Sequence, residues 1–433
     1  MASRSSQLTL GFASPIDGEA GATIVYDVVD DRVVRVVTTG RGTFRSAVES
    51  RHTPVASAGA FDDAAGAFDY GWLRSASWPQ VTEPRSTLSI ADLFCGSGGL
   101  SLGAWEAARA MQLELRPSLA IDNDPDAVGV YRDNFEPHVS FCAGIETLVG
   151  DTVGAPTSDQ ERVLQRSLAA IDLLVAGPPC QGHSDLNNHT RRDDPRNALI
   201  SRVIRFVELF EPRHVVIENV QGIRHDRSGA FQVAQNDLRR LGYQTVDLLL
   251  EGSEIGLPQR RRRCFLIASK STVGCHSRIL DLHRSVPKSF DWACRDLEGQ
   301  HSSAVFDTSA KVYAENQRRM DFLIENDLYD LPNEERPDCH RLKKHDYQSV
   351  YGRLRPDLPT PTITTGFGSP GQGRYTHPRY ARTITPHEAA RLQFIPDFFV
   401  FRLEKRKRLQ KLIGNSVPSK LAFAVILDLL AHE

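Results

Sequence analysis

The chain lacks the features that mark membrane, secreted and metal-stabilised proteins. Its 433 residues contain no apolar run long enough to span a membrane and no signal peptide, which predicts a cytoplasmic protein. The seven cysteines are scattered and none forms a CxxC pair, which indicates a reducing compartment and argues against a disulfide framework or a structural zinc. The formal net charge of −2 excludes a strongly basic, histone-like binder of nucleic acid. No metal is expected.

The length allows more than one domain, and the first 85 residues differ from those that follow. Two valine-rich runs, 22–29 and 32–37, flank an Asp-Asp pair and predict a β-hairpin. The stretch 56–66 is rich in alanine, glycine and aspartate, which is typical of a linker. Residues 1–85 are therefore interpreted as a β-rich N-terminal extension, whose role the residues do not reveal.

From residue 86 onward, strand-like and helix-like segments alternate. The expected strands are 87–94, 118–122, 171–176, 214–219 and 264–268, and the expected helices are 101–111, 197–210 and 231–241. This alternation predicts an α/β fold with a Rossmann-like, doubly wound sheet. It stops between residues 269 and 382, a polar stretch that is interpreted as an inserted recognition region. Helical segments at 386–393 and 418–432 follow, so the main domain is expected to comprise 86–268 and 383–433.

The pentapeptide GPPCQ at 177–181 places a thiol just beyond a buried strand. The two prolines end strand pairing and fix the backbone, so Cys180 is presented in a constrained turn. In open α/β sheets this edge is where ligands bind. For the motif taken alone, a buried structural cysteine is the alternative.

A glycine-rich turn follows the first strand of the alternating part, in the sequence FCGSGGLSLG at 94–103. Glycines let a backbone approach a ligand closely, and the start of the next helix favours a polar or anionic group. Asp122 ends the following strand, near the offset of about 20 residues at which an acid binds ribose hydroxyls. The turn and the acid together indicate an adenosine-containing cofactor, with a plain tight turn as the alternative.

Two further strands carry charged residues where chemistry is expected. Glu218 ends a buried run at the ligand edge, where desolvation raises the pKa of a carboxyl group and lets it share a proton. A capping or solvated acid is the alternative. Arg261 and Arg263 fall on one face of an entering strand and can contact phosphate or carbonyl groups. The basic run KRKR at 405–408 is typical of a solvated helix surface that brushes nucleic acid.

Taken in order, these motifs resemble those of the DNA (cytosine-5) methyltransferase family. The turn at 94–103 is similar to its S-adenosylmethionine loop, GPPCQ to its nucleophile motif and ENV at 218–220 to its proton-handling motif. The spacing QxRxR at 259–263 resembles its arginine strand. TPHEAARLQFIPD at 385–397 resembles the helix that supports the recognition domain, and GNSVP at 414–418 the motif that closes over the cofactor. The resemblance extends from residue 86 to the C-terminus.

The resemblance implies methyl transfer from S-adenosyl-L-methionine to C5 of a flipped-out cytosine in double-stranded DNA, through a covalent cysteine intermediate. The implied catalytic residues are Cys180, Glu218, Arg261 and Arg263. The implied cofactor-binding residues are Phe94, Gly96, Gly98, Gly99, Leu100, Asp122, Asn123, Pro178, Asn415, Ser416 and Val417. The implied substrate-binding residues are Gln181, Ser184, Asn219, Gln259, Thr364, Gln372 and Arg374.

The resemblance further implies a monomer that acts away from membranes. It leaves open whether the chain serves restriction–modification, phage defence or regulation. A tRNA cytosine-5 methyltransferase resembles the same family and is one alternative, although the long insert and the extension favour DNA. A non-catalytic DNA-binding relative is another, although intact Cys180, Glu218 and Arg263 argue against it.

Two positions depart from the family's pattern. Where the family commonly has Gly-Asp-Ile contacting the adenine of the cofactor, this chain reads Ala143-Gly144-Ile145, so the acid is absent. After the nucleophile motif, His183 replaces the usual phenylalanine. The second change concerns the closing contacts of the catalytic loop rather than the chemistry.

The end of the insert pairs a short β-like run, 361–368, with a glycine-rich loop at 371–375. Thr364, Gln372 and Arg374 can reach phosphate or base edges from there. Arg374 is expected either to read a guanine or to hold a phosphate, and these two roles differ in whether its loss changes sequence preference. A surface loop without a role in recognition is the alternative.

Overall fold

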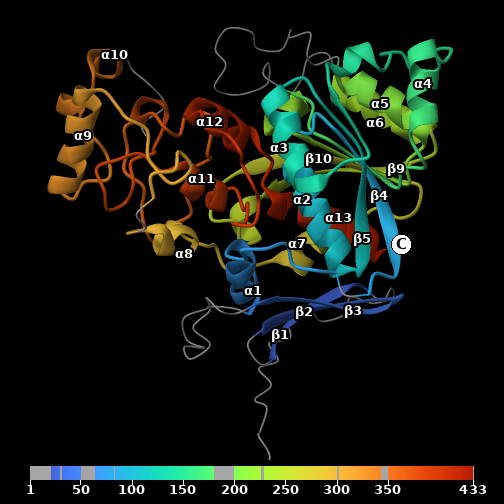
Figure 1. Cartoon of the computed structure of the whole chain (residues 1–433), viewed down its shortest axis with the longest axis horizontal. Coiled ribbons are helices and arrows are strands. Elements are labelled where there is room, and N and C mark those ends of the chain that lie inside the picture. The colour runs from blue at the N-terminus through green and yellow to red at the C-terminus, as the bar shows by residue number, and fades with distance from the viewer. Residues whose placement is uncertain are drawn as a thin grey trace, which may run out of the picture.

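The computed structural model describes residues 21–29, 32–49, 64–81, 83–179, 199–225, 229–299, 302–342 and 350–432. Figure 1 shows a central sheet on the right, a small blue sheet below it, and a second lobe on the left in yellow to red. The chain thus completes the central sheet, passes through the second lobe, and returns to the sheet with its last helix.

The central sheet contains seven strands. They are β4 (Ser86–Leu93), β5 (Leu113–Asp122), β6 (Val139–Cys142), β7 (Leu173–Ala176), β8 (His214–Asn219), β9 (Gln244–Glu251) and β10 (Arg262–Ser269). Their order is β6-β5-β4-β7-β8-β10-β9, parallel from β6 to β8, with β10 antiparallel to β8 and to β9. The predicted doubly wound α/β fold is confirmed, while the two edge strands β6 and β9 were not predicted.

Helices cover both faces of this sheet. They are α2 (Gly99–Ala110), α3 (Pro125–Phe135), α4 (Asp159–Ser167), α5 (Leu199–Phe210), α6 (Ala230–Arg240), α7 (His276–His283) and α13 (Ser419–Ala431). Apolar residues of α2, α7 and α13 share a core with one face, and those of α4, α5 and α6 share a core with the other. Because α7 begins seven residues after β10, the start of the expected insert belongs to the main domain instead.

One stretch, Arg406–Ala431, is long and apolar enough to resemble a membrane span, which the sequence reading did not anticipate. It consists of α12 (Arg406–Asn415) followed by α13. Its most apolar window is 89% buried inside the protein, and α13 packs against α2. This stretch therefore forms part of the hydrophobic core.

The N-terminal extension forms an antiparallel sheet and one helix. The sheet consists of β1 (Thr23–Val29), β2 (Arg32–Thr39) and β3 (Gly42–Glu49), and the helix is α1 (Ala64–Leu73). The expected hairpin is present as β1 and β2. The sequence did not predict β3, and α1 begins inside the segment that was expected to be a linker.

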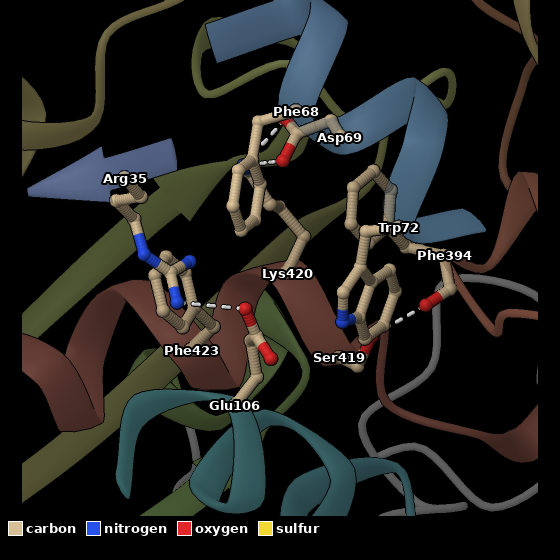
Figure 2. A pocket seen from close by; sticks show the side chains of 9 residues that line it. All are labelled: Arg35, Phe68, Asp69, Trp72, Glu106, Phe394, Ser419, Lys420 and Phe423. Carbon is tan, nitrogen blue, oxygen red and sulfur yellow. Dashed lines mark hydrogen bonds and ion pairs between the residues drawn. The ribbon is translucent and has the colours of Figure 1, made fainter. Parts of the chain in front are cut away.

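The extension packs tightly on the main domain, as Figure 2 shows. Arg35 of β2 pairs with Glu106 of α2 at 2.8 Å, and Asp69 of α1 pairs with Lys420 of α13 at 2.6 Å. Although burial alone would raise the pKa of Glu106, the Arg109 and Arg35 guanidinium groups hold it below its usual value. The cavity between these side chains measures only about 10 Å³, room for no more than a single water. The extension is thus part of the same core as the central sheet.

The second lobe contains short helices joined by long irregular segments (Figure 1). Its helices are α8 (Phe290–Cys294), α9 (Ala314–Glu325), α10 (Asp338–Arg341) and α11 (Pro386–Leu392), together with α12. The short 3-10 turns of the chain are η1 (Ile145–Thr147), η3 (Gln221–His225), η4 (Gly252–Glu254), η5 (Arg295–Leu297), η6 (Asn333–Glu335) and η7 (Pro370–Gln372).

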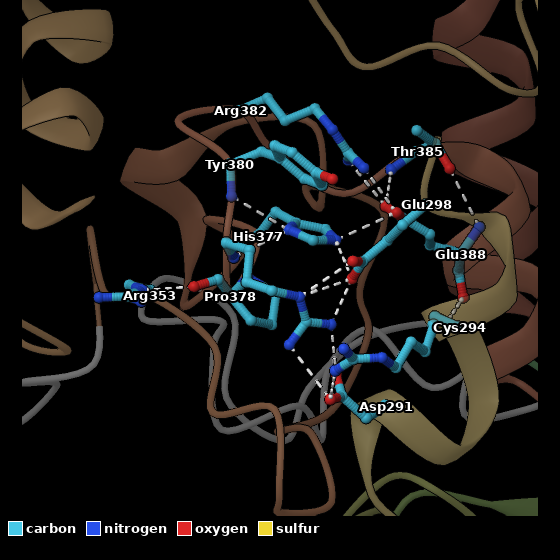
Figure 3. Close-up of polar contacts among 12 residues, drawn as sticks. Asp291, Cys294, Glu298, Arg353, His377, Pro378, Tyr380, Arg382, Thr385 and Glu388 are labelled. Carbon is cyan, nitrogen blue, oxygen red and sulfur yellow. Dashed lines mark hydrogen bonds and ion pairs between the residues drawn. The ribbon is translucent and has the colours of Figure 1, made fainter. Parts of the chain in front are cut away.

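A buried polar network joins the end of the insert to α8 and α11 (Figure 3). His377 is fully buried, with its Nε2 3.4 Å from Glu388 and 3.6 Å from Glu298. Arg382 pairs with Glu388 at 2.7 Å, and Arg379 pairs with both Glu298 and Asp291. Burial would raise the pKa of Glu388, but its hydrogen bonds to Arg382 and the nearby His377 ring lower it to about 2. This network fixes the insert on the helix that follows it.

Candidate active site

The carboxyl ends of β4, β5 and β7 meet at one edge of the central sheet, where the sequence predicted the site. The backbone nitrogen of Cys95, just after β4, donates to Ile121 O in β5 at 3.0 Å. The nitrogen of Gly177, just after β7, donates to Leu93 O in β4 at 3.2 Å. The glycine turn and the start of GPPCQ therefore lie side by side, as expected for the ligand edge of an open α/β sheet.

The structure explains in different ways why glycine occupies each of three positions in this turn. Gly96 has a φ of 52°, and a Cβ on it would meet open space. A Cβ on Gly98 would lie 2.4 Å from the Phe135 ring, and one on Gly99 would lie 2.2 Å from Val417 O. Gly96 thus leaves room for a ligand, whereas Gly98 and Gly99 allow close contacts within the protein.

Two apolar side chains flank the turn. Phe94 has a φ of 60°, which is uncommon for any residue other than glycine. Leu100 is buried, and its Cδ1 lies 3.8 Å from where a Gly177 Cβ would stand. Leu100 therefore lies between the glycine turn and the segment that leads to Cys180.

Asp122 holds the glycine turn against the end of β5. Its Oδ2 accepts the Gly96 N–H at 2.9 Å, and its Oδ1 accepts the Asp124 N–H at 2.9 Å. Burial raises the pKa of Asp122, and these two hydrogen bonds oppose that rise. Each carboxylate oxygen can accept a second hydrogen bond, so the carboxylate can also meet a ligand. Asn123, the next residue, is exposed.

Asp92 in β4 is a buried acid that the sequence reading missed. Ser101 Oγ donates to Asp92 Oδ2 at 2.6 Å, so the Tyr131 hydroxyl, 2.8 Å from Ser101, must donate to that serine. Asp92 Oδ1 and Ser97 Oγ have no partner within the described part of the chain. Burial raises the pKa of Asp92 to about 8, so it is largely protonated at neutral pH. An acid inside an otherwise apolar strand was the available signal.

The GNSVP segment lies against the glycine turn and is held there by ion pairs. Lys411 of α12 binds Asp124 at 2.7 Å, and Arg408 binds Asp126 at 2.7 Å. Asn415 is exposed and Ser416 is buried, at the end of α12. The KRKR run was expected to be solvated, and two of its arginines instead make contacts within the protein: Arg408 binds Asp126 and Arg406 donates to Val305 O at 3.0 Å.

Glu218 and Arg263 form an ion pair at the end of β8. Arg263 Nε lies 2.7 Å from Glu218 Oε1, and a Cβ on Gly177 would lie 3.8 Å from Glu218 Oε2. Burial raises the pKa of Glu218, and the guanidinium groups of Arg263 and Arg261 oppose that rise. The next residue, Asn219, is buried, and its Oδ1 accepts the Val220 N–H at 2.8 Å. A carboxyl group that can share a proton therefore faces the segment that leads to Cys180.

Gln259 and Arg261 bind other parts of the protein. Gln259 Oε1 accepts the Ile363 N–H at 2.8 Å, and its Nε2 donates to Gln393 Oε1 at 3.0 Å. Arg261 donates to Ile363 O at 2.7 Å and to Ser416 O at 3.2 Å, and it is only 3% exposed. Both side chains hold the insert and the GNSVP segment on the sheet. Gln393, which completes this cluster, was missed by the sequence reading.

Of the insert residues predicted to contact substrate, Gln372 is exposed. Thr364 Oγ1 lies 2.8 Å from the Tyr375 hydroxyl. Arg374 donates to Tyr329 O at 2.7 Å and also pairs with Asp330. The contacts of Arg374 therefore give it a role in holding the insert together.

Several predicted residues lie outside the described part of the chain. These are Cys180, Gln181, His183 and Ser184. The described residues before this segment end with two prolines. Pro178 is buried and Pro179 is exposed. Among the described residues, no group of histidine, cysteine and acidic side chains could hold a metal ion.

Comparisons with known proteins agree with this geometry. The profile described as C-5 cytosine-specific DNA methylase matches residues 88–431. The chain is 48% identical over 363 residues to Type II methyltransferase M1.BsuMI of Bacillus subtilis (strain 168), covering 84% of this chain and 85% of that protein. It is 29% identical over 384 residues to Type II methyltransferase M.DdeI of Desulfomicrobium norvegicum, covering 78% and 87%.

Among solved structures, a DNA modification methyltransferase encoded within an E. coli prophage shares the fold. The TM-score is 0.55 at 23% identity, covering 80% of this chain and 99% of that one. The match to the family over most of the chain, together with the M1.BsuMI relative, confirms the resemblance found in the sequence. The chain therefore belongs to the C-5 cytosine-specific DNA methylase family and is a DNA (cytosine-5) methyltransferase.

Proposed function

We propose that this methyltransferase uses S-adenosyl-L-methionine and works through a covalent adduct between Cys180 and a cytosine flipped out of double-stranded DNA. The observation that carries the proposal is the buried Glu218–Arg263 pair beside Gly177, three residues before Cys180. This places a carboxyl group with a raised pKa next to the motif that holds the thiol. Such a pair of groups suits addition to a pyrimidine ring.

The residues at the sheet edge fit the proposed cofactor. Gly96 faces open space, half-buried Phe94 offers apolar surface with Leu100 packed behind the turn, and the Asp122 carboxylate can accept from ribose hydroxyls. Asp92 Oδ1 and Ser97 Oγ are buried and unpartnered within the described part of the chain. When bound, the cofactor supplies an electrophilic methyl group. We assign the remaining contacts to Gly98, Gly99, Asn123, Pro178, Asn415, Ser416 and Val417.

In the proposed reaction, the Cys180 thiolate adds to C6 of cytosine, and Glu218 shares its proton with N3. Addition makes C5 nucleophilic enough to take the methyl group, which it is not in free cytosine. A base then removes the C5 proton, the C6–S bond breaks to release the Cys180 thiolate, and N3 returns its proton to Glu218, so the ring regains its C5=C6 double bond. Arg263 keeps Glu218 in place and opposes the rise of its pKa. A thiol has an unperturbed pKa near ~8.5, so Cys180 needs positive charge nearby to react at neutral pH.

Arg261 and Gln259 are proposed to act indirectly. Arg261 holds Ile363 and Ser416, which brings the end of the insert next to the GNSVP segment. We therefore treat Arg261 as a positioning residue. Gln181, Ser184, Asn219, Thr364 and Gln372 remain proposals for contact with DNA. Arg374 was also expected to contact DNA, but its bonds to Tyr329 O and Asp330 favour a role in holding the insert together.

The chain is proposed to work as a monomer in the cytoplasm and to protect DNA in a restriction–modification system. The support for that setting is that relatives of the chain, among them M1.BsuMI and M.DdeI, are Type II methyltransferases. The expected target is a short site in duplex DNA, read by side chains of the insert.

The test is transfer of labelled methyl groups from S-adenosylmethionine to duplex DNA and to tRNA. We expect label on the duplex and on C5 of cytosine, with loss of activity in Cys180→Ser. Bisulfite sequencing of DNA from a host that expresses the chain would then give the target site. Label on tRNA alone, or transfer that survives Cys180→Ser, would contradict the proposal.

A further inference from the structure

The turn after β6 lacks the acid that the family commonly places there, and another acid lies in the same space. Gly144 occupies the position of the usual aspartate. A Cβ built on Gly144 would lie 2.1 Å from Glu146 Oε1 and 2.6 Å from Glu146 Oε2. The Glu146 carboxylate therefore fills the volume where a side chain at position 144 would begin.

This turn is fixed beside the proposed cofactor site. The Ala143 N–H donates to Asp122 O at 2.9 Å, and Asp122 is paired with Cys142 across β5 and β6. Thr147 Oγ1 donates to Gly144 O at 2.8 Å, and Ile145 is buried in the core. The backbone that carries Glu146 is thus tied to the strand end that holds the glycine turn.

The Glu146 carboxylate is available to a ligand. The side chain is exposed, and within the described part of the chain its carboxylate takes part in no hydrogen bond or ion pair. A free carboxylate on a fixed turn accepts hydrogen bonds and donates none. Its natural partner is an amino group.

We propose that Glu146 accepts a hydrogen bond from the 6-amino group of the cofactor's adenine and so replaces the acid absent at Gly144. This inference rests on the proposed use of S-adenosylmethionine. A carboxylate at this corner favours a 6-amino purine and disfavours a 6-oxo purine, because the oxo group presents a second acceptor in place of the donor. Glu146 thereby contributes to the choice of adenine.

The first experiment compares two probes by titration calorimetry on the full-length protein. S-adenosylhomocysteine carries the 6-amino group, and S-inosylhomocysteine carries a 6-oxo group in its place. Glu146→Ala should weaken the binding of S-adenosylhomocysteine about tenfold or more, which is the usual effect of losing a hydrogen bond to a charged group. The affinity of this variant for S-inosylhomocysteine should be unchanged or higher than that of the unaltered protein. Glu325→Ala, at an exposed glutamate ending α9, serves as the matched control and should change neither affinity.

The second experiment moves the acid back to the family's position. The Gly144 backbone, with φ −67° and ψ 138°, accepts an aspartate without strain, but its Cβ would displace the Glu146 carboxylate. Gly144→Asp alone should therefore bring little gain in affinity. In combination with Glu146→Ala, it should restore S-adenosylhomocysteine binding to within about threefold of the unaltered protein.

The outcomes separate the two claims. If the unaltered protein does not bind S-adenosylhomocysteine, the proposed function fails, and the inference fails with it. If it binds, and Glu146→Ala weakens both probes equally or neither, the role of Glu146 is overturned while the proposed function stands. Absence of rescue in the double variant would likewise contradict a shared acceptor position.

Discussion

Arg263 and Glu218 form an ion pair at the ligand edge of the sheet, with Arg263 Nε 2.7 Å from Glu218 Oε1. Both side chains are largely withdrawn from water, at 14% and 10% exposure. Burial favours the neutral carboxylic acid, and the guanidinium favours the carboxylate. The balance between the two sets the pH range in which Glu218 can give or take a proton.

Removing the positive charge of Arg263 should move the pH range in which Glu218 exchanges a proton. Arg263→Gln is expected to raise the pKa of Glu218 further, because burial is then opposed only by the charge of Arg261. The limb of the pH–rate profile that depends on Glu218 should shift to higher pH, and single-turnover methyl transfer at neutral pH should fall on the order of 100-fold. Arg262→Gln is the matched control, since Arg262 is exposed and pairs with Glu251. A profile that moves equally in both variants would refute the assignment.

Substitutions at Asp122 and Glu218 should have different effects, the first on cofactor binding and the second on turnover. Asp122→Ala should weaken the binding of S-adenosylhomocysteine roughly tenfold or more, because it removes the proposed ribose acceptor and the hydrogen bond that holds Gly96. Glu218→Gln should leave that affinity nearly unchanged and slow turnover. Calorimetry and single-turnover kinetics on both variants measure this. Equal losses of affinity would show that the two roles are misassigned.

Asp92 should make stability depend on pH. Its folded pKa of about 8 lies above its ordinary value of 3.8, so the folded protein holds a proton that the unfolded chain has lost between these values. The stability contribution of Asp92 is therefore complete below about pH 4 and lost as pH rises toward 8, by roughly 1.4 kcal/mol per pH unit.

Asp92→Asn keeps an acceptor for Ser101 but does not titrate. Its melting temperature should exceed that of the unaltered protein by an amount that grows from pH 5 to pH 7.5. Asp357→Asn, at an exposed acid, should show no such trend. A difference for Asp92→Asn that is constant over this range would mean that the buried acid is ionised.

Arg374 should affect the insert rather than the choice of sequence. Arg374→Ala removes bonds to Tyr329 O and Arg353 O and the pair with Asp330. We expect affinity to fall for every duplex to a similar extent, with site preference and salt slope unchanged. Gln372→Ala, at the exposed neighbour, provides the comparison. Relaxed preference at one base position, measured by binding to a panel of single-substitution duplexes, would restore the base-reading role.

Local patterns in the sequence were sufficient to predict the central strands of the fold. The strand at 171–176 and its Pro-Pro stop, and the run ending in Glu218, depend on residues close together in the chain, and both strands are present. The edge strands β6 and β9 have half-exposed patterns, so their hydrophobic periodicity was weak. β3 likewise depends on its pairing with β2.

Some residue roles could not be predicted from the sequence because they depend on contacts that only the fold creates. Gln259 looked like a substrate contact in its motif, but its amide bonds to Ile363 and Gln393, more than 100 residues away. Gly99 was predicted as a site for ligand approach, and the structure adds a second reason for a glycine there, since the absence of a side chain makes room for Val417. The contact of Glu146 with Gly144 is local, but no sequence motif indicates that this turn brings the carboxylate back to the residue two positions earlier.

The most direct test of the account is to trap the proposed adduct on duplex DNA that contains 5-fluorocytosine, which cannot lose its C5 substituent after methylation. The account predicts a covalent complex, formed only with S-adenosylmethionine present, whose peptide map places the base on Cys180. Cys180→Ser should abolish it, and Cys142→Ser, at an exposed cysteine, should not. A complex mapped to Cys95 or Cys142, or one that persists in Cys180→Ser, would contradict the central claim.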